Sequence, residues 1–232
     1  RQPGGYHEQT KSLFASVELG WASQYYLTVT GRNDWPSMLA GPHSNKRSFF
    51  YPSVGGSWIV SETLKLPKAI DYLKLRASWG KLGNDHVAAS AGFASIATGN
   101  GASGVYGNAT IAGYQNTSYF SWLKWELVDE TNVGVNLGLF DSRLSLDADY
   151  FHRMTRDAVI STALPFDNKT LAGNHGKILN QGFDIALTWA DRIGRDFRYH
   201  AGTNLSFLWN EVKSLSGAAM VNNGKVYNIV GK

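Results

Sequence analysis

Residues 197–209 read FRYHAGTNLSFLW. From Phe197 to Trp209, every second residue is aromatic, aliphatic or Thr, and the residues between them include Arg198, His200 and Ser206. Successive side chains of a strand point to opposite faces, so this period of two predicts a β-strand with one apolar and one polar face. The stretch is longer than the roughly 9 to 11 residues with which a tilted strand crosses a bilayer.

Seven further segments repeat this alternation, at 13–21, 25–33, 49–60, 73–80, 132–139, 144–151 and 183–189. Their apolar faces tend to end in large aromatic residues, namely Trp21, Tyr25, Trp58, Trp79, Tyr150, Trp189, Phe197 and Trp209. Such a girdle is typical of a transmembrane β-barrel. A Lys or Arg in lipid costs roughly 2 to 4 kcal/mol at the midplane, so the polar faces are predicted to line a wet interior.

The connectors between these segments alternate between short and long. The short ones are 22–24, 61–71, 141–142 and 190–195, and the long ones are 34–47, 83–121 and 157–178. Tight periplasmic turns and wide extracellular loops give outer-membrane barrels this asymmetry. Within the second short connector, Ser61 is predicted to cap a helical turn that Pro67 ends.

The composition sets further bounds. The chain has 232 residues, no cysteine and a formal net charge of +4, and its basic residues form no cluster, which argues against nucleic acid as a partner. No apolar run approaches the roughly 18 residues of a membrane helix. The mean hydropathy of −0.24 fits a barrel, because only alternate residues meet lipid. It also fits a soluble antiparallel β-sandwich, whose strands alternate in the same way.

Enzymatic patterns have weak support. Residues 99–104 match a dinucleotide fingerprint by letter but lack its strand-to-helix setting. Asp147 and Asp149 share one strand face, and no second acid from a loop is there to complete a glycosidase pair. The six histidines lack metal-ligand spacing. We therefore expect no catalytic residue, no metal site and no cofactor, and no enzymatic activity.

Several longer stretches carry a family resemblance. Residues 26–37 read YLTVTGRNDWPS, 48–54 read SFFYPSV, 73–85 read LKLRASWGKLGND, 131–136 read TNVGVN and 174–184 read NHGKILNQGFD. In this order they resemble signatures of the SusC/RagA family of TonB-dependent outer-membrane transporters of the Bacteroidetes.

The resemblance implies an all-β, antiparallel fold, in which the chain forms about 8 to 10 strands of a larger plugged barrel of about 22 strands. Residues 1–232 would all belong to the barrel domain, with the plug, the TonB box and the final strands outside them. It implies a bacterial outer-membrane protein that imports oligosaccharides, glycan fragments or peptides with a SusD-like surface lipoprotein and TonB. The alternatives are a passive porin-type channel and a soluble carbohydrate-binding β-sandwich.

Two groups of residues are candidates for transport. Polar residues on the face predicted to line the lumen could hold the plug or line the route, and these are Arg76, Asp147, Asp149, Asp184, Arg198 and His200. Aromatic residues in or beside the long loops could stack on sugars or meet the lipoprotein, and these are Trp35, Tyr106, Tyr114, Tyr119 and Trp122. For each residue taken singly, solvation of the wall, loop packing or a place in the aromatic girdle accounts for it as well.

Overall fold

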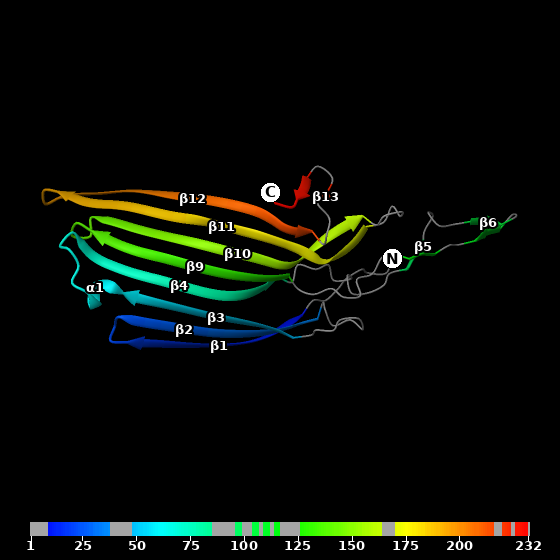
Figure 1. Ribbon diagram of the computed structural model, residues 1–232, viewed down its shortest axis with the longest axis horizontal. Helices are drawn as coiled ribbons and strands as arrows, with labels where there is room; N and C mark the ends of the chain where they lie inside the picture. The colour runs from blue at the N-terminus through cyan, green and yellow to red at the C-terminus, as the bar shows by residue number, and fades with distance from the viewer. Residues whose placement is uncertain are drawn as a thin grey trace.

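The computed structural model describes residues 9–37, 48–84, 96–98, 104–106, 109–111, 114–116, 126–163, 170–215, 220–223 and 226–231. Its main element is an eight-stranded antiparallel sheet in the order β1-β2-β3-β4-β9-β10-β11-β12 (Figure 1). The strands are β1 (Thr10–Trp21), β2 (Tyr25–Pro36), β3 (Phe49–Ile59), β4 (Ile70–Asn84), β9 (Glu126–Leu139), β10 (Leu144–Ala163), β11 (Thr170–Ile193) and β12 (Phe197–Leu215). All eight predicted strands are confirmed.

The strands reach further toward the long connectors than the alternation predicts. Most of the predicted connector 157–178 is strand, because β10 continues to Ala163 and β11 begins at Thr170. The reason is a bulge between Thr155 and Ala158, where the pairing with β11 shifts and Asp157 takes a φ of 56°. A bulge reverses which face the following residues occupy, so a strict period of two loses the strand at this point.

The connector predicted at 83–121 also contains strands. β5 (Ile96–Thr98) pairs with β8 (Tyr114–Asn116), and β6 (Gly104–Tyr106) pairs with β7 (Ala109–Ile111). Near the C-terminus, β13 (Met220–Asn223) pairs with β14 (Val226–Ile229). These small pairs lie outside the main sheet.

The other end of the sheet carries the tight turns. Ala22 and Ser23 join β1 to β2 with positive φ, and residues 140–142 do the same between β9 and β10. The connector predicted at 190–195 is shorter in the structure, since β11 runs to Ile193 and Gly194 begins the turn with a φ of 66°. The predicted cap at Ser61 is wrong, because α1 (Val60–Thr63) contains Ser61 and its N-cap is Ile59.

Two adjacent rows of paired residues define the faces of the sheet. One row crosses all eight strands and is entirely apolar: Trp21, Tyr25, Trp58, Leu75, Val135, Ala148, Ile185 and Leu205. The next row runs Gly20, Tyr26, Ser57, Arg76, Gly134, Asp149, Asp184 and Ser206. We call the two sides the apolar face and the polar face.

The pairing register also gives the tilt of the strands. The apolar row contains Trp21, the last residue of β1, and Ile185 of β11. Ile185 lies eight residues before the end of β11 at Ile193, and β11 is the sixth strand after β1 across the sheet. With about 3.3 Å per residue and about 4.8 Å between strands, turns that lie at one level require a tilt of about 40°. Barrel strands typically tilt by 35 to 45°.

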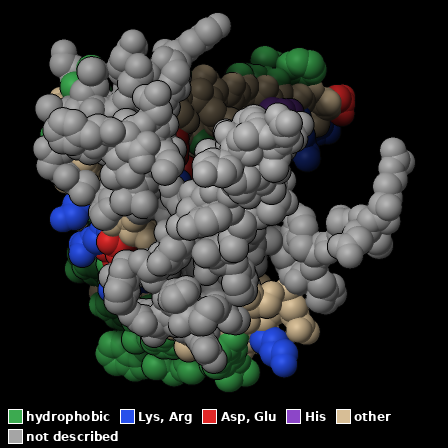
Figure 2. All heavy atoms as spheres, turned by 90° about the vertical axis from the view of Figure 1, so that its right-hand side faces the viewer, with side chains coloured by type: hydrophobic (Ala, Val, Ile, Leu, Met, Phe, Trp, Pro, Cys, Tyr) green, Lys and Arg blue, Asp and Glu red, His purple; other side chains and the backbone are tan. Residues whose placement is uncertain are grey.

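Packing within the sheet is uneven. Two small clusters of buried side chains lie at the loop end, one of Phe49 and Tyr51 and one of Ile160, Val212 and Leu215. On the apolar face, by contrast, Leu13 is 68% exposed and Trp21 is 73% exposed. The end-on view shows hydrophobic side chains gathered along the margin of the described part (Figure 2). Among the described residues, no helix is long and apolar enough to cross a membrane.

Candidate functional site

A hollow of about 900 Å³ lies on the polar face. Residues of β2, β3, β4, β9, β10, β11 and β12 line it, and nearly all of them belong to that face. The lining combines charged side chains such as Arg76 and Asp149 with the apolar side chains of Phe151 and Leu208. The hollow is therefore a property of the assembled sheet, because strands far apart in the sequence supply its walls.

An ion pair crosses the middle of the hollow. Arg76 of β4 donates through Nη2 to Asp149 of β10, at 2.9 Å from Oδ1 and 2.8 Å from Oδ2. Both side chains are about two-fifths exposed. Between them in the row lies Gly134 of β9, and a Cβ there would overlap the Asp149 carboxylate and approach Arg76. The glycine thus leaves the space through which the pair joins two strands that are not neighbours.

A second ion pair lines the hollow toward the loop end. Arg153 of β10 donates through Nε to Oε2 of Glu130 at 3.1 Å, and Asn132 donates to Oε1 of the same carboxylate at 3.1 Å. Glu130 and Arg153 face each other directly on β9 and β10. Each acid of the two pairs meets an arginine, so the charges of this part of the wall balance.

Two further acids of the polar face, Asp147 and Asp184, are bound by neutral groups. Asp147 accepts a hydrogen bond from Asn136, and Asp184 accepts one from the Ser206 hydroxyl at 2.6 Å. Asp147 and Asp149 therefore have different partners, and both partners lie on the β9 side of β10. Lys74 also lines the hollow, and no ion pair joins it to another described residue.

The six candidates for the lumen all lie on the polar face, but only some of them lie together. Arg76, Asp149 and Asp184 occupy one row and line the hollow. Asp147 is one same-face position from Asp149 toward the turns. Arg198 and His200 lie near the turn end of β12, where they are exposed and face Arg192 and Ala190.

The aromatic loop candidates are less well placed. Trp35 lies within β2, on the apolar face opposite Lys11, and is 41% exposed. This position fits the aromatic girdle. Tyr106 and Tyr114 belong to β6 and β8, for which the structure describes the backbone. Tyr119 and Trp122 lie outside the described residues.

Several residues that line the hollow were not predicted from the sequence, chiefly Glu130, Arg153 and Leu208. Glu130 and Arg153 lie just beyond the segments read as strands, at 132–139 and 144–151. Extending the alternation by one same-face step on each strand would have found both.

Comparison with known proteins places this sheet in a family. The family described as TonB dependent receptor-like, beta-barrel matches residues 1–229. The chain belongs to this family. This TonB-dependent receptor barrel is 28% identical over 221 residues to TonB-dependent receptor P3 of Formosa agariphila. The match covers 92% of this chain and 22% of that protein. The barrel is 24% identical over 213 residues to TonB-dependent receptor SusC of Bacteroides thetaiotaomicron, covering 89% of this chain and 21% of that one.

Solved structures agree with this assignment. A structure of the RagAB peptide importer in the "open-open" state matches with a TM-score of 0.83 and 25% identity, over 97% of this chain and 24% of that chain. The siderophore receptor PirA of Pseudomonas aeruginosa matches with a TM-score of 0.57 and 15% identity and shows the shared fold alone. The predicted relationship to SusC and RagA is confirmed. The TonB-dependent receptor barrel described here spans about a fifth to a quarter of the length of these relatives.

Proposed function

We propose that this chain forms part of the wall of an outer-membrane importer, with the apolar face toward lipid and the polar face toward the interior. The two adjacent rows carry this proposal. One presents eight apolar residues across eight strands, and the next presents Arg76, Asp149 and Asp184. Exposing a large apolar face to water is costly, and so is placing an unpaired charge in lipid. Both rows are therefore favourable only if the apolar face meets lipid and the polar face meets water.

The interior wall would contact the plug or the moving substrate through its hollow. The Arg76–Asp149 and Glu130–Arg153 pairs are internally neutral, so they offer hydrogen bonds without a strong net field. Asp184 and Lys74 add one group of each sign, and Phe151 and Leu208 add apolar surface. Such a mixed wall suits a partner with both polar and apolar groups, such as an oligosaccharide, a peptide or a plug segment.

The proposal includes partners that complete the transporter. A SusD-like surface lipoprotein would meet the loop end, and TonB would supply energy through regions outside residues 1–232. SusC and RagAB, to which this chain is similar, support this assignment. The cargo is expected to be a glycan fragment or a peptide.

The test uses the full-length protein in its host. Membrane fractionation should place it in the outer membrane, and uptake of labelled oligosaccharides or peptides should require both this protein and TonB. Uptake that persists without TonB would indicate a passive channel. Recovery as a soluble monomer without detergent would contradict the barrel assignment and favour a soluble β-sandwich.

A further inference from the structure

We propose that cations at the loop end of the apolar face bind phosphate groups of lipid headgroups in the outer leaflet. The cations are Lys81, Arg156, Lys177 and Lys213, and we call them the rim cations. This inference rests on the proposed outer-membrane location, and it adds a lipid site to the outside of the wall.

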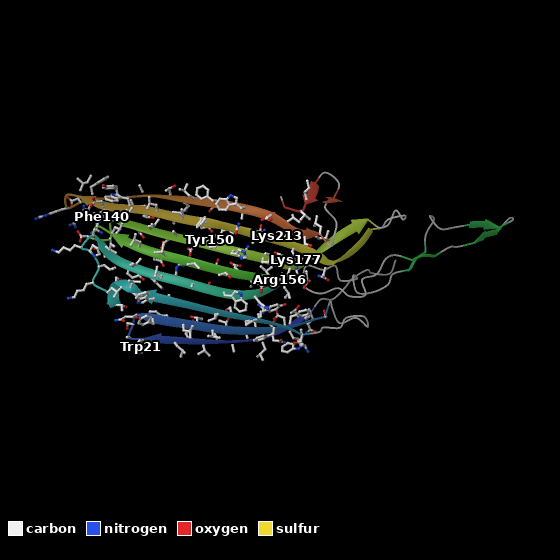
Figure 3. All side chains as sticks on the ribbon, in the orientation of Figure 1. Trp21, Phe140, Tyr150, Arg156, Lys177 and Lys213 are labelled. Carbon is white, nitrogen blue, oxygen red and sulfur yellow. The ribbon has the colours of Figure 1, made fainter. Side chains whose placement is uncertain are left out.

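The position of the rim cations is the first support. On the apolar face, no Lys, Arg, Asp or Glu lies between the aromatic residues near the turns and those near the loops. The loop-side aromatic residues include Phe50, Trp79 and Trp209, which are 61%, 38% and 53% exposed. The rim cations begin directly beyond this level. Figure 3 shows Arg156, Lys177 and Lys213 near one end of the sheet, and Trp21 and Phe140 near the other.

The rim lies slightly above the headgroup layer, within the length of a Lys or Arg side chain. Lys213 follows Trp209 by four residues on β12, which is about 13 Å along the strand and about 10 Å in height at a tilt of about 40°. Headgroups extend about 5 to 8 Å beyond each side of the roughly 30 Å hydrocarbon core. A lysine side chain at this level, with its stem along apolar surface, reaches phosphate oxygens easily.

Two irregularities in the sheet present these side chains. Ile178 pairs with Val212 and Lys177 pairs with Ser214, so Lys213 is an extra residue in β12. Arg156 lies at the bulge of β10 between Thr155 and Ala158. Bulges change the direction of a side chain relative to the regular ladder. Strands β10, β11 and β12 therefore bring Arg156, Lys177 and Lys213 to one region of the rim.

The rim cations are only partly neutralised by ion pairs. Arg156 Nε donates to Asp129 Oδ2 at 2.9 Å, and Lys81 Nζ lies 3.9 Å from Asp129 Oδ1. Lys213 Nζ lies 2.7 Å from Glu211 Oε2. These two carboxylates pair with three of the four cations, and no described acid forms an ion pair with Lys177. The Arg156 side chain is 58% exposed. An excess of exposed positive charge just above an apolar surface is complementary to a phosphate joined to acyl chains.

The test measures lipid binding to the full-length protein, purified from the outer membrane in mild detergent. Native mass spectrometry compares phosphatidic acid, whose headgroup is a phosphate monoester, with diacylglycerol of the same chains. The rim variant carries Arg156→Gln, Lys177→Gln and Lys213→Gln. A control variant carries Lys74→Gln, Arg192→Gln and Arg198→Gln, which remove the same charge from the polar face.

We expect the unchanged protein and the control variant to prefer phosphatidic acid. The rim variant should bind it at least about tenfold more weakly, since each cation near an anionic surface contributes about fivefold. An equal loss of phosphatidic acid binding in both variants, or no loss of it in the rim variant, would overturn the inference. So would unchanged lipid binding with loss of a co-purifying lipoprotein, which would assign the rim cations to a protein partner. If the unchanged protein were absent from the outer membrane, the proposed function itself would fail.

Discussion

The two faces of the sheet are built from the same strands, yet the middle of one face carries ion pairs and the middle of the other is apolar. Val133 and Gly134 are neighbours in β9, and Val133 is 52% exposed on the apolar face. Gly134 lies on the polar face beneath the ion pair of Arg76 and Asp149. If water met both sides of the sheet, the exposure of Leu13, Trp21 and Val133 would cost free energy. The contrast indicates that the two faces meet different solvents.

The largest expected effect comes from placing a charge on the wrong face. Val133→Arg should destabilise the folded protein in a bilayer by roughly 2 to 4 kcal/mol, because Val133 lies near the middle of the apolar band. Chemical denaturation in lipid vesicles measures the change. The matched control is Asn132→Arg, one residue away on the polar face. Equal costs for the two substitutions would mean that the faces do not differ in solvent.

A smaller effect should follow from filling the space over Gly134. Gly134→Ala places a methyl group against the Asp149 carboxylate, and overpacking of this kind costs typically about 1 to 3 kcal/mol. Gly20→Ala is the control in the same row, since its new Cβ would lie 3.4 Å from the Tyr26 ring in ordinary contact. Thermal unfolding in micelles should separate the two variants. If the two variants unfolded at the same temperature, the close approach of Asp149 to Gly134 would not contribute to stability.

Sequence patterns were sufficient for the strands and their faces, and insufficient for the contacts between strands. Alternation placed Arg76 and Asp149 on polar faces, because facing depends only on parity within one strand. It could not pair β4 with β9, since the connection between them holds two small strand pairs that carry no long periodicity. The partners of Arg76, and the need for a glycine at position 134, follow only from that pairing.

The loop end was harder to predict for a second reason. The bulge at residues 155–158 changes parity, so Ile160 falls on the side where it packs with Val212 and Leu215. The alternation predicts that the strand ends at Asn33 and that Trp35 lies in or beside a loop, whereas β2 continues to Pro36. The first error lies where a bulge breaks the alternation, whereas in the second β2 keeps its regular pairing to Pro36.

The smallest expected effect concerns the ion pair itself. A double-mutant cycle with Arg76→Gln and Asp149→Asn should give a coupling of about 1 kcal/mol or less, because both side chains are partly exposed. The coupling should weaken further in high salt. Unfolding of the four proteins at two salt concentrations measures it. A coupling of several kcal/mol would show that water does not reach this face.

The most direct test of the two-solvent account is a cysteine scan along β9 in the bilayer. The 232 residues contain no cysteine, so Val133→Cys, Val135→Cys and Leu137→Cys can be compared with Asn132→Cys, Gly134→Cys and Asn136→Cys. A fluorophore on each thiol is exposed to a lipid-bound quencher and to a water-soluble one. The account predicts that the first three are quenched from the lipid and the last three from water. Quenching from water at all six positions, or quenching without alternation, would contradict it.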